Sequence, residues 1–223
     1  MTGSVVGHLI LKDWRLHRMQ IIVSVAGGAA ALALAQIKSE VPVVLGAVWF
    51  FLALILLANF LPSSNIVNER KKQNLPFLMS LPVSPMQYTW SKMVSTYGMF
   101  LVPWLALVAA AVSLIATMGI PRGFIPTLLM LAGLTLFGFS LIAGVAIVGE
   151  SEGSFIAATI VCNSSYGIGW YLISRVPAIQ HDMGGPVPVW RPEVLTLLAC
   201  ELAGVVLVLG LTFFLQSRKR DFI

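Results

Sequence analysis

The sequence has few charged residues, which make up only 10% of its 223 positions. A soluble domain carries about a quarter charged residues. Hydrophobic residues account for 58% of the chain, and its mean hydropathy is +0.90. No soluble fold hides so much apolar surface, so lipid must surround most of this chain. We therefore expect an all-α polytopic membrane protein, because a helix satisfies its own backbone hydrogen bonds in lipid.

The sequence also lacks the residue patterns of an enzyme. Its two cysteines, Cys162 and Cys200, lie inside apolar runs and have no metal-ligand spacing. Its three histidines, His8, His17 and His181, fall outside those runs, whereas an intramembrane protease needs a histidine at depth beside its nucleophile or metal. No G-x-x-x-x-G-K-[ST] phosphate loop is present. We expect no catalytic residue, no metal site and no cofactor in this chain.

Six apolar runs have the length of a membrane span. They cover residues 20–37, 43–61, 94–118, 125–148, 155–173 and 194–215 of a single domain, 1–223. If the N-terminus is inside, ten lysines and arginines lie on inner segments and four on outer segments. Cations are retained on the inner side, so both termini are predicted to be cytoplasmic. The net charge of +5 is thus a topology signal, and no nucleic-acid partner is expected.

Residues 5–18 are predicted to form an amphipathic helix at the membrane surface. One side of the helix would carry His8, Lys12, Arg15 and Arg18, and the other Val6, Leu9, Ile10 and Trp14. Asp13 and His17 interrupt the apolar side, and a solvated basic lead-in is the alternative. A cleavable signal peptide would also begin with basic and then apolar residues, but this segment is long for that role.

The stretch 68–92 is the longest polar interruption between the spans, and it contains the basic run Arg70, Lys71 and Lys72. Apolar residues follow at helical spacing, which predicts a short helix with one apolar face. Pro82 ends this helix, because a proline cannot continue it. Ser84 has the character of an N-cap and is followed by Pro85, so a second helix is predicted to continue into the third span.

This stretch resembles the segment between spans two and three of ABC-2 type permeases, the membrane subunits of type V ABC exporters. The likeness covers about 25 residues and rests on Glu69, Arg70, Leu78, Leu81, Pro82, Val83, Ser84 and Lys92. The order of the whole chain is also similar: a basic interfacial helix, six spans, a short inner turn after span four and a longer outer loop before span six. Where the family often has Gly-Thr after the basic pair, this chain has Gln73, Asn74 and Leu75.

The resemblance implies that residues 68–81 form a coupling helix in a groove of a cytosolic ATPase subunit, with a second contact at 149–154. The coupling residues would be Glu69, Arg70, Lys71, Leu75, Leu78, Met79, Leu81, Glu150 and Glu152. Two ABC ATPase subunits would bind ATP and Mg²⁺, and a second copy or a similar permease would complete the path. The implied location is the cytoplasmic (inner) membrane of a bacterium or archaeon. The loop between spans five and six would form short outer helices.

Three polar residues inside the spans are candidates for a substrate path: Glu201, Asn163 and Asn59. A charged side chain at the centre of a span costs about 2.5–3.5 kcal/mol. Glu201 would therefore face the path or pair with Arg175 or Arg191, unless it reaches the interface. Hydrogen bonds between helices explain the two asparagines equally well. A channel or secondary transporter working without an ATPase, and a non-transporting membrane scaffold, are the alternative functions.

Overall fold

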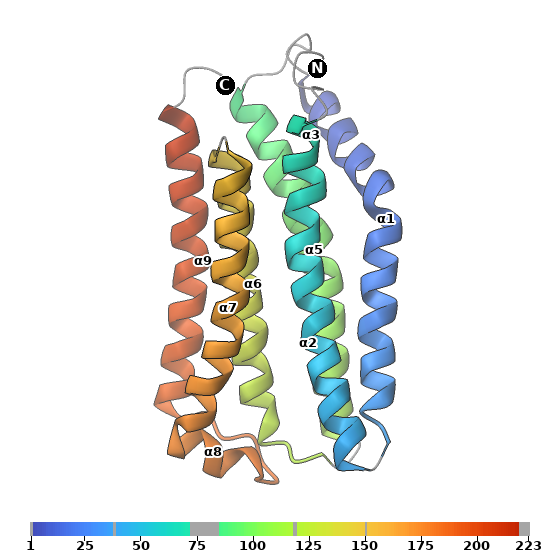
Figure 1. The fold of residues 1–223 in the computed structure, drawn as a ribbon, viewed down its shortest axis with the longest axis vertical. Helices are drawn as coiled ribbons and strands as arrows, with labels where there is room; N and C mark the ends of the chain where they lie inside the picture. Colours follow the sequence, from blue (N-terminus) through green and yellow to red (C-terminus); the bar gives the residue numbers. More distant parts are fainter. Residues whose placement is uncertain (1, 38, 72–84, 118–119, 150, 219–223) are drawn as a thin grey trace.

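A computed structural model describes residues 2–37, 39–71, 85–117, 120–149 and 151–218. Within these ranges all regular structure is helical (Figure 1). Six helices are long and apolar enough to cross a membrane. They are α1 (Thr2–Leu34), α2 (Glu40–Pro62), α5 (Pro85–Thr117), α6 (Phe124–Val148), α7 (Glu152–Arg175) and α9 (Pro192–Arg218). The chain is therefore an all-α polytopic membrane protein, which confirms the fold class predicted from composition.

The six helices stand side by side, with α1 and α9 at opposite edges of the view in Figure 1. The first residues of α1 and the last residues of α9 lie at the same end of the bundle. We call this end, which also holds α3 (Asn68–Lys71) and the first turn of α5, the basic end. The opposite end, the far end, holds the short helix α8 (Pro177–Met183). The resemblance implies short outer helices in this loop, and on which side of the membrane α8 lies stays a prediction.

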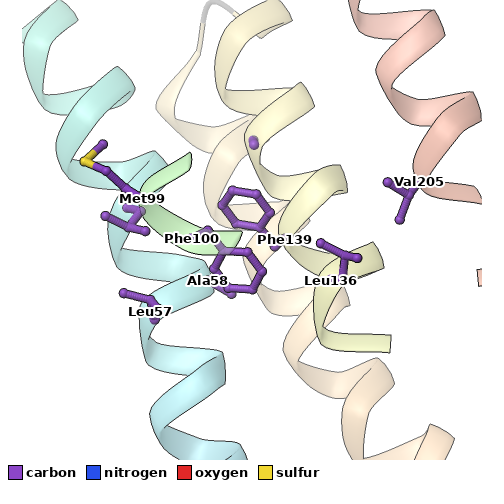
Figure 2. Close-up of a cluster of buried hydrophobic side chains, with 9 residues drawn as sticks. Leu57, Ala58, Met99, Phe100, Leu136, Phe139 and Val205 are labelled. Atoms are coloured by element: carbon purple, nitrogen blue, oxygen red, sulfur yellow. The ribbon is translucent and has the colours of Figure 1, made fainter. Parts of the chain in front are cut away.

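Aromatic stacking joins the helices in the middle of the bundle (Figure 2). The rings of Phe100 on α5 and Phe139 on α6 are stacked, with centroids 4.0 Å apart and planes 9° from parallel. Side chains from α2, α5, α6 and α9 surround them in one buried cluster, which includes Leu57, Ala58, Met99, Leu136 and Val205. Dispersion contacts of this kind hold helices together where lipid removes the hydrophobic driving force.

The central helix α6 uses its glycines to admit polar side chains from its neighbours. The Glu201 carboxylate lies against Gly133, and the Tyr166 hydroxyl lies so close to Gly138 that an added Cβ would be 2.2 Å from it. The absence of a glycine side chain lets α7 and α9 approach α6 closely, as small residues do at membrane helix interfaces. This packing explains why 61% of the α6 span is buried, a larger share than in the other five spans.

Several helix limits differ from the predicted limits. The segment predicted as an interfacial helix, 5–18, and the predicted span 20–37 are parts of one continuous helix, α1. The second span does not end at Pro62 but continues as a π-helix, η1 (Ser63–Val67), into α3. Helix α5 is described from Pro85 and runs on through Pro103 without ending. The predicted cap, Ser84, lies outside the described residues.

Candidate functional site

The candidate site begins with the π-turn at the basic end of α2. Pro62 has no N–H group, so it cannot donate the helical hydrogen bond to the carbonyl four residues earlier. Directly after Pro62 the helix has a wider turn, in which the N–H of Asn68 donates to the carbonyl oxygen of Ser63. Such single π-turns are frequent at functional sites. Here the turn directs the side chains of Asn65 and Ile66 into the bundle, where both are buried.

Lys92 on α5 lies at the centre of a buried cluster of charges. Its Nζ is 3.0 Å from Oδ2 of Asp13 on α1 and 2.6 Å from Oε2 of Glu69 on α3. It also donates a hydrogen bond of 3.1 Å to Oδ1 of Asn65. The side chains of Lys92 and Asp13 are only 4% and 3% exposed. A charge this deeply buried is tolerated only when opposite charges and hydrogen bonds surround it, as they do here.

A second lysine balances the cluster. The Nζ of Lys12 is 3.1 Å from Oε1 of Glu69 and 3.7 Å from Oδ1 of Asp13. Burial by itself would raise the pKa of the Glu69 carboxyl, but the ammonium groups of Lys92 and Lys12 lower this pKa below its ordinary value. Two carboxylates therefore face two ammonium groups, and the cluster carries no net charge when all four are ionised.

Hydroxyl and amide groups complete the cluster. The Oγ of Ser95 donates to Oδ2 of Asp13 at 2.9 Å, and Nδ2 of Asn65 donates to Oγ1 of Thr96 at 2.8 Å. Lys92, Ser95 and Thr96 share one face of α5 because they are three and four residues apart. We call the group formed by Lys12, Asp13, Asn65, Glu69, Lys92 and Ser95 the base cluster. It joins α1, η1, α3 and α5 at one point.

The base cluster connects the two ends of the stretch 68–92. Glu69 stands near the start of the stretch 68–92 and Lys92 is its last residue, and their side chains form a salt bridge. The residues between 72 and 84 lie outside the described part of the chain. The Tyr88 hydroxyl adds a hydrogen bond of 3.2 Å to Oε2 of Glu69. The stretch is therefore closed at its base by charged contacts, and Asp13 attaches that base to α1.

The predicted coupling residues are described only in part. Leu75, Leu78, Met79, Leu81 and Glu150 lie outside the described residues, as do the side chains of Arg70 and Lys71, whose backbones belong to α3. Glu69 turns inward to the base cluster. Glu152 is exposed in the first turn of α7, where a carboxylate is favoured, and the hydroxyl of Ser151 caps that helix.

Two of the three predicted path residues are brought together. Nδ2 of Asn59 on α2 donates to Oδ1 of Asn163 on α7, with 3.0 Å between the atoms. Asn163 is exposed and Asn59 is half-buried, so this amide pair lies on the surface of the bundle. Asn163 stands 11 residues from the start of α7, which corresponds to a depth of about 16 Å at 1.5 Å per residue.

Glu201 stands apart from this pair. It is buried on α9 against Gly133 of α6. Its Oε2 atom has no hydrogen-bond partner within the described residues. Neither arginine suggested as its partner is paired with it: Arg191 binds Asp182, and the guanidinium of Arg175 lies over the Tyr171 ring. Of the alternatives for Glu201, pairing with Arg175 or Arg191 is therefore not found in the structure.

At the far end, one ion pair fastens α8 to the segment that precedes α9. The guanidinium of Arg191 donates from both Nε and Nη2 to the Asp182 carboxylate, with the Nη2 bond at 3.1 Å. Hydrogen bonds from Arg191 lower the pKa of Asp182 to about 2. The backbone of the turn at Gly123 lies against Asp182 and Met183, where only a glycine fits. The loop between α7 and α9 is thus held against the turn that precedes α6.

Reasoning from the sequence missed the base cluster. The sequence shows Lys92 only as the last residue of the stretch 68–92, but its side chain is buried in the bundle, whereas Trp90 is exposed. The available signal was Asp13 with His17, two polar residues that interrupt the apolar side of the first helix. Both are 2% exposed, so the interruption marks a protein-facing side.

Comparison of the chain with protein-family models, with curated proteins and with solved structures finds no match.

Proposed function

We propose that this chain is the membrane permease subunit of an ATP-binding-cassette exporter, with separate ATPase subunits that drive it. The six-helix layout and the resemblance of the stretch 68–92 to ABC-2 type permeases support this proposal. The distribution of lysine and arginine favours a cytoplasmic position for the basic end. In the proposal two ATPase subunits bind ATP and Mg²⁺ there, and a second permease copy or a similar permease completes the path across a bacterial or archaeal cytoplasmic membrane.

The base cluster is the observation that carries the proposal. Lys92 joins Glu69 to Asp13, so the stretch 68–92, α1 and α5 share one attachment point. The peptide backbone links the same point to α2 through η1. Separating a buried ion pair is costly because each charge would be left without a partner. Force applied to the stretch by an ATPase would therefore move the ends of three spans together.

The amide pair Asn59–Asn163 is the proposed wall of the translocation path. Asn163 is exposed at membrane depth, where lipid cannot satisfy the groups of its amide that Asn59 leaves unpaired. Water in a path, or a second permease facing this side, would satisfy them. Glu201 lies against Gly133 of α6 and forms no hydrogen bond with Asn59 or Asn163, so we do not place it on the same wall.

Co-purification tests the proposal. The full chain, tagged and extracted in mild detergent from the cells that encode it, should bring with it a P-loop ATPase. Charge reversal at Arg70 and Lys71 should weaken this association, whereas reversal at Arg15, an exposed cation at the same end, should not. Transport by the purified chain in vesicles without ATP and without an ATPase would contradict the proposal and favour a channel or secondary transporter.

A further inference from the structure

The edge helix α9 packs on α6 through one seam. The two helices run side by side in the same direction (Figure 1), and 11% of the α9 span is buried, against 61% of the α6 span. Glu201 lies against Gly133 and Thr212 lies against Gly144, so both contacts follow one register along the pair. The buried residues of α9 share one side of the helix and define the seam: Val194, Glu201, Val205, Val208 and Thr212.

Glu201 differs from the other members of the seam. Three of them are valines, and the Thr212 hydroxyl donates to the carbonyl oxygen of Val208 in its own helix at 2.8 Å. Glu201 is 9% exposed, and its Oε2 has no hydrogen-bond partner within the described residues. A Cβ added to Gly133 would lie 2.2 Å from this oxygen, so no other group stands between the carboxyl and α6.

The ionisable groups around the seam do not pair with Glu201. The α6 span contains no ionisable residue, so nothing on this helix can neutralise a carboxylate. In the part of the chain that the structure describes, Glu201 forms no ion pair. The groups that leave it unpaired are Glu193 and Cys200 on α9, Tyr166 and Arg175 on α7, Asp182 on α8 and Lys92 on α5.

The depth of Glu201 makes an unpaired charge costly. Glu201 stands nine residues after Pro192, which corresponds to a depth of about 14 Å at 1.5 Å per residue. A buried carboxylate without a partner loses the hydration of its charge, and such a group becomes neutral instead. Ionisable residues within membrane spans frequently belong to ion or proton pathways. A proton is the ligand that neutralises this carboxyl without needing any space in the seam.

We propose that Glu201 is a proton-binding site, which holds a proton while α9 is packed on α6 and gives it to water when the two helices separate. On release the carboxyl O–H bond breaks, its electron pair stays on the carboxylate and the proton passes to water. Protonation therefore favours the packed seam, and ionisation favours a separated α9. The inference goes beyond the proposed function and does not depend on it, because no ATPase and no transported substrate takes part.

Carboxyl NMR of the full chain in detergent tests whether the proton is present. The chain has six glutamates, and ¹³C-carboxyl labelling separates protonated from ionised carboxyl groups. At neutral pH the folded chain should show a protonated carboxyl signal that Glu201→Gln removes. Glu193→Gln, at an exposed position of the same helix, should remove an ionised signal instead. An ionised Glu201 in the folded chain at neutral pH would overturn the proposal.

The pH dependence of folding measures how tightly the seam holds the proton. In the unfolded chain Glu201 ionises above about pH 4.3. While the folded chain keeps the proton, each further pH unit should lower the folding equilibrium constant about tenfold relative to Glu201→Gln, whose amide does not titrate. Glu201→Leu, which is apolar like the valines of the seam, replaces the amide variant if that variant does not fold. A stability difference that stays constant as the pH rises would overturn the proposal.

Cysteine reactivity tests whether ionisation separates the helices. In a chain without Cys162 and Cys200, Val205→Cys places a thiol in the buried seam, and Leu202→Cys places one on the exposed side of α9. The rate of maleimide labelling at 205, divided by the rate at 202, should rise with pH by up to about tenfold per unit, because the ionised fraction of Glu201 rises at that rate. With Glu201→Gln added, the ratio should stay constant. A ratio that is independent of pH in both backgrounds would overturn the proposed link between the proton and the packing of α9.

Discussion

At the scale of single residues, the buried surroundings of Lys92 require its positive charge. It faces Asp13 and Glu69 in a site that excludes water almost completely. Whether a buried ion pair stabilises a protein relative to apolar residues depends on the case, but removal of one partner leaves an uncompensated charge. The effect of replacing Lys92 on stability is therefore set by the loss of its charge beside Asp13 and Glu69 rather than by the change in side-chain volume.

Lys92→Met should destabilise the chain by about 3–5 kcal/mol, because Asp13 and Glu69 lose their buried partner and keep only the half-exposed Lys12. The thermal unfolding midpoint in detergent measures the effect. Arg18→Met, which removes an exposed cation from α1, should change stability by about 0.5 kcal/mol or less. Adding Asp13→Asn and Glu69→Gln to Lys92→Met should recover part of the loss, because the uncompensated charges are then gone. Purely additive losses would contradict this account of the cluster.

Asp182 should titrate far below an ordinary aspartate. Its pKa is lowered from 3.8 to about 2, mainly by hydrogen bonds from Arg191. Because the folded-state pKa is depressed, the contact is fully present above pH 3.8 and is lost as the pH falls toward 2. The chain has only three aspartates, so ¹³C-carboxyl labelling of aspartate resolves this signal by NMR. Arg191→Gln should return the midpoint toward 3.8, and an unchanged midpoint would show that Arg191 is not the cause.

At the scale of helices, the close approach of α1 and α2 depends on a glycine. A Cβ added to Gly46 of α2 would lie 2.7 Å from the carbonyl oxygen of Ala31 on α1. Backbone atoms cannot move aside as the tip of a side chain can, so the two helices would have to separate. Close backbone contacts of this kind are typical of membrane helix pairs with small residues at the interface.

Gly46→Ala should therefore cost about 1–3 kcal/mol, the range found when a packed interface receives an extra methyl group. Gly27→Ala on α1 is the matched control, because nothing lies within 4 Å of its added Cβ. That control should be neutral or stabilising, since alanine favours a helix by about 1 kcal/mol over glycine. Thermal unfolding in the same detergent compares the two variants, and equal stabilities would argue against the close contact.

At the scale of the whole molecule, the six helices define which segments share a side of the membrane. Val187 lies in the outer loop at the far end, and Gly153 lies in the first turn of α7 at the basic end. Both positions are exposed in the structure. A label that cannot cross a membrane should therefore reach one of them and not the other.

In a chain without Cys162 and Cys200, Val187→Cys should react with an impermeant maleimide applied to intact cells. Gly153→Cys should react only after the membrane is opened, because the positive-inside rule places the basic end in the cytoplasm. Its added side chain meets nothing within 4 Å, so the fold should tolerate it. Labelling of both cysteines from the same side would contradict the six-span arrangement.

The sequence by itself determined that the chain crosses a membrane and how many helices do so. Hydrophobicity along the chain is a local property, and a run such as 125–148 needs a span's length of lipid whatever its neighbours are. The helix predicted to continue from Pro85 into the third span is also present, as α5. The predicted end of the second span at residue 61, in contrast, was wrong, because the helix continues through Pro62 into a π-turn.

Only the tertiary structure decided which polar residues meet. Asp13 and Lys92 are 79 residues apart, and Asn59 and Asn163 are 104 residues apart. A helical pattern shows which side of a helix a residue lies on, but not which helix packs against that side. Buried charges reduce their cost by finding partners across the bundle, and those partners depend on how all six helices pack. The base cluster therefore belongs to the assembled bundle rather than to any one segment.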